Sequence, residues 1–236
     1  MRDLILKQAD SLTVMSNMPP NSVDLILTDP PYKTITGGDS NGKNSIRPAG
    51  ILQGNRKLFQ YQKISIHDWM PLLFRVLKEG CHCYVFTNAL NMREMLNEAE
   101  QAGFKLHNIL CWEKQNCTPS QYYMKNCEYV LFLRKGKAKW INHIGSSMTV
   151  HQFHNPIGRK LHPTEKPVEL LKFYIENSVV AGDTVFDPFM GSGSTGVAAL
   201  QCGADFIGIE LDEQYYRIAC QRLGMTEEES SSGTFS

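Results

Sequence analysis

The sequence predicts an α/β protein in which helices cover both faces of a sheet. Short apolar runs alternate with segments of helical periodicity along nearly the whole chain, and this alternation is typical of α/β folds. The length of 236 residues and the hydrophobic content of 42% suit one domain with a sizeable core and exclude a wholly disordered chain. Two unusual motifs directly follow predicted strands, which is where α/β proteins bind their ligands.

Six apolar runs are the expected strands, and a further apolar run, 4–6, opens the chain. The expected strands are 23–28, 81–87, 107–112, 129–133, 184–186 and 206–209. The run 23–28 has β-branched residues at both ends, which is consistent with a buried parallel strand. It stops at two prolines, and prolines cannot continue a strand ladder.

The expected helices carry apolar residues at helical spacing. In the segment 67–79 these residues are Trp69, Leu72, Leu73, Val76 and Leu77, and Gly80 is expected to end the helix. The other expected helices are a short one that ends near Met18, then 91–102 with Gly103 as its cap, 165–180, 194–202 and 212–223.

Three segments show no sustained period. Residues 33–62 are rich in Gly, Asn, Ser and Lys, and we expect a long mobile loop with a functional role. Residues 135–161 form an irregular insert, and 224–236 form an acidic, serine-rich tail that we expect to be disordered. A single domain is therefore expected over 1–223.

The composition narrows the class of protein. No apolar run approaches the roughly 18 residues that a membrane span needs, and the N-terminus lacks the layout of a signal peptide. Seven cysteines are an odd number for a disulfide scaffold, so we expect reduced thiols in a cytoplasmic protein. The 24 basic and 24 acidic residues give a net charge of zero, which by itself argues against a nucleic-acid partner.

The charge is distributed unevenly along the chain. Residues 33–63 hold six basic residues against one acidic residue, which gives +5, and residues 134–166 hold seven against one, which gives +6. The remainder of the chain must then sum to −11. Both basic segments suit contacts with phosphate, although solvated loops of no binding function would show the same pattern.

A glycine-rich turn follows the strand 184–186 and opens a helix. It spans 187–196, and its glycines allow a tight turn and the close approach of a ligand. The free N–H groups of the helix N-terminus suit an anionic group such as a carboxylate. Glu210 ends the next strand, and its carboxylate can accept hydrogen bonds from two ribose hydroxyls. These features predict a nucleoside-containing cofactor across two strand ends.

Two alternatives stay open for this turn. Gly191, Gly193 and Gly196 also satisfy the dinucleotide pattern Gly-x-Gly-x-x-Gly. An NAD enzyme would need several more strands after the turn, and only about 40 residues follow it. A glycine turn without a ligand is the other alternative.

The second motif is Asp29-Pro30-Pro31-Tyr32, and its chemistry suits an exocyclic amine. The lone pair of such an amine is delocalised into its ring. Asp29 and the main-chain carbonyl of Pro30 can accept its two N–H groups, which favours tetrahedral nitrogen and frees the lone pair. Tyr32 offers a face on which a base extruded from a duplex can stack. The plain alternative is a turn that ends a strand beside a buried tyrosine.

Several weaker signals favour structure over function. Cys81 and Cys83 lie on one face of a predicted strand, and no further zinc ligands at suitable spacing accompany them, so we expect core packing. Trp69 and Trp112 are expected in the core, and Tyr122 and Tyr123 as a buried pair that alternatively approaches DNA or a flipped base. We expect three histidines to be solvated or phosphate-facing, and no metal site; they are His143, His151 and His154.

At this point the sequence resembles the DNA amino-methyltransferases, which transfer a methyl group from S-adenosyl-L-methionine to N6 of adenine or N4 of cytosine. The resemblance covers roughly residues 4–223. It rests on 28–32, on His-Pro-Thr-Glu-Lys-Pro at 162–167, on 187–195 and on Ile-Glu-Leu-Asp at 209–212. The catalytic turn precedes the cofactor turn, which is the order of the beta class.

The resemblance implies a Rossmann-like methyltransferase fold, with a seven-stranded, mostly parallel sheet and one reversed strand. It implies catalytic roles for Asp29, Pro30, Pro31 and Tyr32. The cofactor residues that it implies are Asp10, Thr164, Lys166, Asp187, Phe189, Gly191, Ser192, Gly193, Ser194, Thr195, Glu210 and Leu211. Among them, Glu210 would bind the ribose, and Thr164 and Lys166 the methionine carboxylate.

Double-stranded DNA is the expected partner, and a homodimer is an option because the predicted recognition segment is short. The residues expected to contact DNA are Lys43, Arg47, Arg56, Lys57, Lys137, Lys139, Arg159 and Lys160. Asp before Pro-Pro-Tyr favours adenine N6, since relatives with Ser there lean toward cytosine N4. We expect direct in-line transfer without a covalent intermediate. The remaining alternatives are N4-cytosine methylation, a non-catalytic DNA-binding protein and a nucleotide-dependent oxidoreductase.

Overall fold

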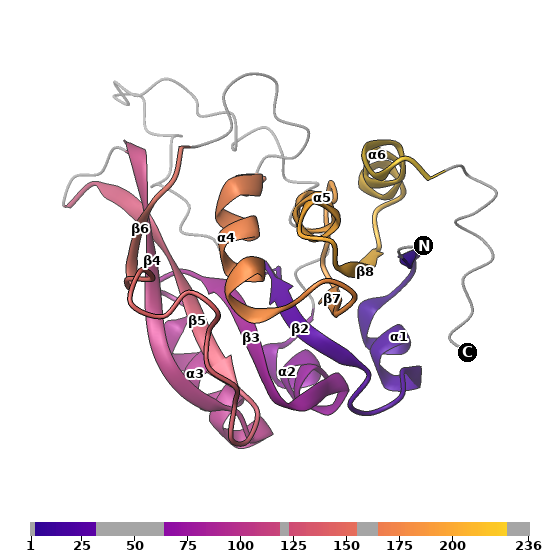
Figure 1. Cartoon of the computed structure of the whole chain (residues 1–236), viewed down its shortest axis with the longest axis horizontal. Helices are drawn as coiled ribbons and strands as arrows, with labels where there is room; N and C mark the ends of the chain where they lie inside the picture. Colours follow the sequence, from indigo (N-terminus) through magenta and orange to yellow (C-terminus); the bar gives the residue numbers. More distant parts are fainter. Residues whose placement is uncertain (1–2, 32–63, 119–122, 155–164, 226–236) are drawn as a thin grey trace, which may run out of the picture.

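The computed structural model describes residues 3–31, 64–118, 123–154 and 165–225. Eight strands in this part of the chain form one sheet. They are β1 (Leu4–Gln8), β2 (Val23–Thr28), β3 (Leu77–Thr87), β4 (Lys105–Thr118), β5 (Lys125–Arg134), β6 (Val150–Gln152), β7 (Thr184–Asp187) and β8 (Asp205–Glu210). Their order across the sheet is β1-β8-β7-β2-β3-β5-β4-β6 (Figure 1).

All six strands predicted from apolar runs are present, the opening run 4–6 lies in β1, and β6 is a further strand that was not predicted. The neighbouring strands β1, β8, β7, β2 and β3 all run parallel. β5 is antiparallel to both β3 and β4, and β6 is parallel to β4. The prediction of one reversed strand is therefore confirmed for the described part of the chain. The expected count of seven is corrected to eight, because β6 has only three residues and is too short to show a periodic pattern.

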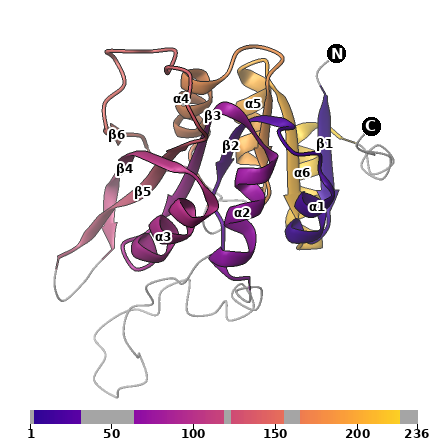
Figure 2. The same ribbon diagram turned by 90° about the horizontal axis from the view of Figure 1, so that it is seen from below.

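Six helices of the described chain cover the two faces of the sheet. They are α1 (Ser11–Asn17), α2 (Ile66–Val76), α3 (Met92–Ala102), α4 (Val168–Ser178), α5 (Ser194–Gln201) and α6 (Glu213–Leu223). Buried residues of α1, α2 and α3 form a core on one face, and those of α4, α5 and α6 form a core on the other (Figures 1 and 2). This three-layer arrangement agrees with the predicted fold class. Trp69, Trp112, Cys81 and Cys83 are buried in these cores, as expected.

The end of α2 differs from its prediction. The helix stops at Val76, and Leu77 already has the extended backbone of β3. Gly80, with φ of 80°, lies inside β3 at an irregularity where the register with β2 shifts between Val23 and Leu25. Its positive φ therefore serves a bulge at the start of the strand and not a helix cap.

Lys135 satisfies backbone carbonyl groups at the end of α2, where the helix passes directly into β3. Its ammonium donates to the carbonyl oxygens of Phe74 and Leu77, both at 2.7 Å, and to Oδ1 of Asn21 at 2.8 Å. The residue is buried. Lys135 had been counted in the phosphate-facing basic segment, and this is corrected, because its charge satisfies the last carbonyls of a helix.

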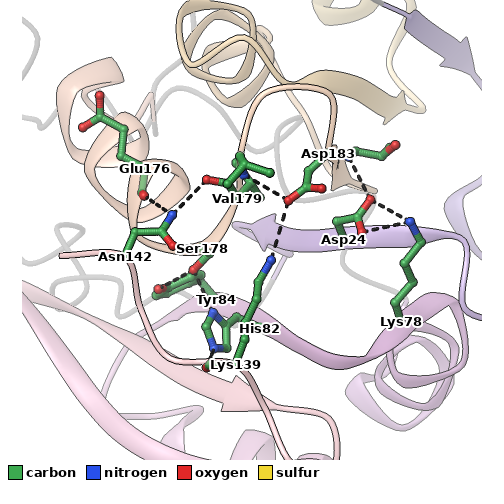
Figure 3. A network of polar contacts seen from close by, with 12 residues as sticks. Asp24, Lys78, His82, Tyr84, Lys139, Asn142, Glu176, Ser178, Val179 and Asp183 are labelled. Atoms are coloured by element: carbon green, nitrogen blue, oxygen red, sulfur yellow. Dashed lines mark hydrogen bonds and ion pairs between the residues drawn. The ribbon is translucent and has the colours of Figure 1, made fainter. Parts of the chain in front are cut away.

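A polar network ties the segment after β5 to the amino-terminal edge of the sheet (Figure 3). The buried ring of His82 lies between the hydroxyl of Ser178, 3.0 Å away, and the carbonyl oxygen of Lys139, 2.9 Å away. Burial lowers the pKa of His82 to about 4. The ammonium of Lys139 lies 3.6 Å from the carboxylate of Asp183. Lys139 is therefore held at the edge of the sheet opposite the carboxyl ends of β2 and β3.

Candidate active site

The two predicted motifs meet at the carboxyl-terminal edge of the sheet. β7 lies between β2 and β8, and all three strands are parallel. Asp29 directly follows β2, Asp187 is the last residue of β7, and Glu210 is the last residue of β8. Three carboxylates therefore lie at the ends of three neighbouring strands, which is the usual ligand position in such sheets.

Asp187 joins the two motifs. Its carboxylate is buried and accepts hydrogen bonds from Oγ1 of Thr28 at 2.8 Å, Oγ1 of Thr195 at 2.6 Å and the backbone N–H of Phe189 at 3.1 Å. Burial raises the pKa of Asp187 to about 6, and the hydrogen bonds from Thr195 and Thr28 oppose that rise. The carboxylate thus fixes the glycine turn to the strand that carries Asp29.

The glycine turn leads into α5 through a left-handed residue. Gly193 is the N-cap of α5 and has a φ of 80°. A residue with a side chain would adopt this left-handed backbone conformation only with strain. Arg222 on α6 holds this turn: its guanidinium donates to the carbonyl oxygen of Ser192 at 3.3 Å and to Oγ of Ser194 at 3.0 Å. It also forms an ion pair of 2.8 Å with the largely buried carboxylate of Glu165.

Glu210 lies beside the same turn. One carboxylate oxygen accepts the backbone N–H of Gly191 at 2.9 Å, and the other accepts that of Asp212 at 2.8 Å. Burial raises the pKa of Glu210 above its ordinary value. The backbone N–H of Leu211 also contacts this carboxylate. A carboxylate has about four acceptor positions, so Glu210 retains capacity to accept a hydroxyl.

Asp10 lies beyond the end of β1, the strand next to β8 in the sheet. It follows β1, and the neighbouring Ala9 donates its N–H to the carbonyl oxygen of Glu210 at 3.1 Å. The carboxylate of Asp10 caps α1 by accepting the backbone N–H of Thr13 at 2.8 Å. Phe189 packs edge-on against Trp69, with ring centroids 6.0 Å apart, and Leu211 is exposed. Apart from Lys166, the described cofactor candidates are thus gathered at the ends of β1, β7 and β8.

Asp29 is paired with Lys166, whose ammonium also lies 3.3 Å from Oε2 of Glu128. Burial alone would lower the pKa of Lys166, but the carboxylates of Asp29 and Glu128 raise it above its ordinary value. Lys114 forms a second ion pair with Glu128. The sequence had suggested that Lys166 binds the methionine carboxylate, whereas here its ammonium contacts the proposed catalytic aspartate.

Glu128 and Lys114 were missed in the sequence. Glu128 directly precedes the predicted strand 129–133 and belongs to no motif. Its register partner is Trp112 on β4, so Glu128 faces the α4 side of the sheet at the same edge as Asp29. A charged residue at the end of an apolar run was the available signal, and it does not distinguish an active-site residue from a solvated one.

Other predicted site residues lie elsewhere. Lys137 and Lys139 follow the end of β5, at the edge of the sheet opposite Asp29. Several fall outside the described residues: Tyr32, Lys43, Arg47, Arg56, Lys57, Arg159, Lys160 and Thr164, as do all of the segment 33–62 and residues 226–236 of the tail. Pro30 is buried, and Pro31 is half-buried.

Two weaker predictions are corrected. His151 is buried, and its ring nitrogen lies 3.2 Å from the hydroxyl of Tyr174, because β6 places it against α4. Tyr123 is 96% exposed next to the start of β5 and is not part of a buried pair. His143 and His154 are exposed, as predicted.

Within the described ranges, no group of three or more His, Cys, Asp or Glu side chains is placed to hold a metal ion. The same residues include no helix that is long and apolar enough to cross a membrane.

Comparison with known proteins identifies the family. A family model described as DNA methylase, of the N6/N4 type, matches residues 23–221. The chain belongs to the N6/N4 DNA methylase family. The methyl donor of this DNA methyltransferase is S-adenosyl-L-methionine, which agrees with the gathering of the cofactor motifs at one edge of the sheet.

Similar proteins match this methyltransferase over nearly its whole length. The type II methyltransferase M2.LlaDCHI of Lactococcus lactis subsp. cremoris is 32% identical over 93% of this chain and 88% of its own. The type II methyltransferase M2.DpnII of Streptococcus pneumoniae is 30% identical over 93% of this chain and 89% of its own. The crystal structure of the M1.HpyAVI–SAM complex shares the fold, with a TM-score of 0.71 and 23% identity over 93% of this chain and 100% of that one.

Proposed function

We propose that this DNA methyltransferase methylates N6 of an adenine that has been flipped out of duplex DNA. The observation that carries the proposal is the 2.8 Å hydrogen bond from Thr28 to Asp187. Thr28 directly precedes Asp29, and Asp187 opens the glycine turn. The bond therefore supports an arrangement in which the acceptor amine and the cofactor occupy neighbouring strand ends.

The described residues fit the proposed cofactor. Glu210 can accept the two ribose hydroxyls, and the backbone N–H groups that open α5 can receive the methionine carboxylate. Phe189 and the turn around Gly191 and Gly193 would enclose the rest of the methionine portion. When bound, S-adenosyl-L-methionine supplies an electrophilic methyl group, and its transfer breaks the bond between sulfur and that carbon.

Asp29 and Pro30 prepare the adenine amine for attack. The carboxylate of Asp29 accepts one N–H of the amine, and the main-chain carbonyl of Pro30 accepts the other. Together these acceptors favour tetrahedral nitrogen, whose lone pair then points along the line of transfer. Asp29 receives the proton that the nitrogen loses when it is methylated. Rate enhancement comes from positioning and from the exclusion of water.

Lys166 keeps Asp29 ionised and oriented. A carboxylate must be charged to accept both a hydrogen bond and a proton, and an adjacent ammonium favours the charged form. Because Lys166 is buried, its attraction to Asp29 is less screened than that of a surface pair. This role is distinct from the carboxylate binding that the sequence suggested for Lys166.

Adenine is favoured over cytosine by Asp29 itself. Members of the family with Ser at this position lean toward cytosine N4, as described above. A test is to incubate the protein with unmethylated duplex DNA and isotope-labelled cofactor and then digest the DNA to nucleosides. Label in N6-methyl-2′-deoxyadenosine is expected. Label in N4-methyl-2′-deoxycytidine would overturn the base assignment, and no label on several diverse DNAs, despite cofactor binding, would overturn the proposed substrate.

The DNA surface is proposed from the basic segments that flank the site in sequence. Lys43, Arg47, Arg56 and Lys57 belong to the first segment, and Arg159 and Lys160 to the second. Lys137 and Lys139 are left out because they lie at the opposite edge of the sheet. We place the enzyme in the bacterial cytoplasm, where its DNA substrate is found. We also propose that the enzyme forms a homodimer, which would supplement its short recognition segment. Analytical ultracentrifugation with and without DNA tests this oligomeric state.

A further inference from the structure

We propose that Glu128 is a positioning residue for methyl transfer, and that it acts on Asp29 through Lys166. The proposal rests on the proposed function and adds a residue to it. Glu128 and Lys114 come from the antiparallel pair of β5 and β4, whereas Lys166 precedes α4 and Asp29 follows β2. Four separate segments thus contribute to one cluster at the edge of the sheet.

The cluster alternates in charge. Lys114 pairs with Glu128, Glu128 with Lys166, and Lys166 with Asp29. The side chain of Lys166 is 8% exposed, that of Asp29 is 22% exposed, and that of Glu128 is 23% exposed. The ammonium of Lys166 also lies 5.0 Å from the centre of the Phe86 ring. Three described groups therefore surround this ammonium.

A buried ammonium needs nearby oxygen atoms that accept its hydrogen bonds and compensate its charge, and for Lys166 two carboxylates supply them. Glu128 and Asp29 divide this task, so the ammonium is fixed between them and not free to follow the movement of Asp29. Burial alone would raise the pKa of Glu128, but Lys166 and Lys114 hold it below its ordinary value. Glu128 therefore stays charged at neutral pH and keeps its ion pair with the ammonium of Lys166.

The orientation of Asp29 follows from this arrangement. Charge-assisted hydrogen bonds are short and directional, so a fixed ammonium sets the plane of the carboxylate that it contacts. Without Glu128, Lys166 would be free to move together with Asp29 and change the direction in which that carboxylate accepts the adenine amine. A misplacement of about 1 Å can cost roughly a hundredfold in rate.

The variant Glu128→Gln tests this role, and Glu113→Gln is its matched control. Glu113 lies on β4 opposite Cys127, on the other face of the same strand pair, where it accepts a hydrogen bond from Gln152. Both variants remove one carboxylate from the hairpin and keep its shape. For Glu128→Gln we expect a fall of at least tenfold in kcat and a change of less than about threefold in the Kd of the cofactor. The control is expected to match the wild type.

The pH profile separates positioning from mere structural support. Loss of the Glu128 charge makes Asp29, which shares Lys166 with Glu128, harder to protonate, while Lys114 and Lys166 stay positive. The acid limb of the kcat profile is therefore expected to move to lower pH in Glu128→Gln. A folded variant with wild-type kcat and an unmoved acid limb would overturn the proposal, and so would a loss confined to cofactor binding.

Crystal structures of the wild type and Glu128→Gln give a readout that does not depend on methyl transfer. A rotated or displaced Asp29 carboxylate is expected in the variant. An unchanged Asp29 and Lys166 would overturn the positioning role even if the wild type were inactive on DNA. An inactive wild type with a displaced Asp29 in the variant would instead contradict the proposed function alone.

Discussion

The hydroxyl of Thr28 donates a hydrogen bond of 2.8 Å to the buried carboxylate of Asp187. The two residues are far apart in the sequence, yet each ends a strand at the same edge of the sheet. One precedes the proposed catalytic aspartate and the other opens the cofactor turn. This contact is the direct physical connection between the two halves of the site.

Thr28→Val should break that connection. Valine keeps the shape of threonine but leaves the buried Asp187 with one donor fewer. A hydrogen bond to a charged group contributes about 1.5–3 kcal/mol, so urea denaturation should show a loss of that order in the free energy of unfolding. Methyl transfer should fall with it, and Thr28→Ser, which retains the hydroxyl, should recover both. Equal stability of the valine and serine variants would contradict the account.

Glu210→Gln should weaken binding of S-adenosyl-L-methionine. The amide keeps one acceptor but loses the charge that strengthens hydrogen bonds from ribose hydroxyls. The loss of about 1.5–3 kcal/mol corresponds to a Kd roughly 10–150 times higher, and calorimetry measures it. Glu213→Gln is the control, since Glu213 is an exposed neighbour that pairs with Arg217. A wild-type Kd in Glu210→Gln would exclude Glu210 from the cofactor site.

His82 should make the protein less stable as the pH falls below neutrality. Its pKa is about 4 in the folded protein and 6.5 ordinarily, so the unfolded chain takes up a proton first. Stability therefore rises with pH between about 4 and 6.5, and the full effect is of order 3 kcal/mol. Asp187, whose pKa is raised to about 6, works in the opposite direction over part of this range.

Comparison with His82→Gln isolates the histidine from Asp187. Urea midpoints measured at pH 7.5 and 5 should fall more in the wild type than in the variant. The variant itself should be less stable at pH 7.5, because it disturbs the contacts with Ser178 and Lys139. If both proteins lost the same stability between the two pH values, His82 would not be the group that titrates.

DNA binding should weaken steeply with salt despite the zero net charge. Each phosphate contact releases condensed counterions, so the affinity falls linearly with salt concentration on logarithmic axes. Replacing Arg56 or Arg159 with Ala should reduce that slope by about 1. Lys137→Ala should leave it unchanged, because Lys137 lies at the far edge of the sheet. Fluorescence anisotropy with a labelled duplex measures the slope, and a larger effect of Lys137 would reverse this assignment.

Local sequence patterns were sufficient to predict most strands of the sheet and the two motifs at its edge. The six predicted apolar runs are all strands, and those in β2, β3, β7 and β8 are buried almost continuously, which requires an uninterrupted apolar run. β6 was not predicted because its three residues are too few to show a strand pattern, and its extended conformation depends on pairing with β4. Gly80 was misplaced for a related reason: a glycine after a helical pattern suits a helix end and a strand bulge equally well.

The partners of charged residues were less accessible to sequence reasoning. Lys166 lies in a motif, yet its contact with Glu128 joins residues 38 positions apart that no spacing rule connects. Lys135 and His151 lie in a polar stretch but have buried partners, so local polarity misplaced them. Pairing between distant segments decides these roles, and it is set by the packing of strands and helices.

Asp29 is proposed to direct methylation to N6 of adenine. This role is tested by sequencing DNA, with detection of modified bases, from cells that express the wild type or Asp29→Asn, with cofactor binding by both purified proteins as the control. We expect N6-methyladenine at one short recurring sequence in wild-type cells, its absence with Asp29→Asn, and similar cofactor affinity for both proteins. N4-methylcytosine in place of N6-methyladenine, or unchanged methylation by Asp29→Asn, would contradict this role of Asp29.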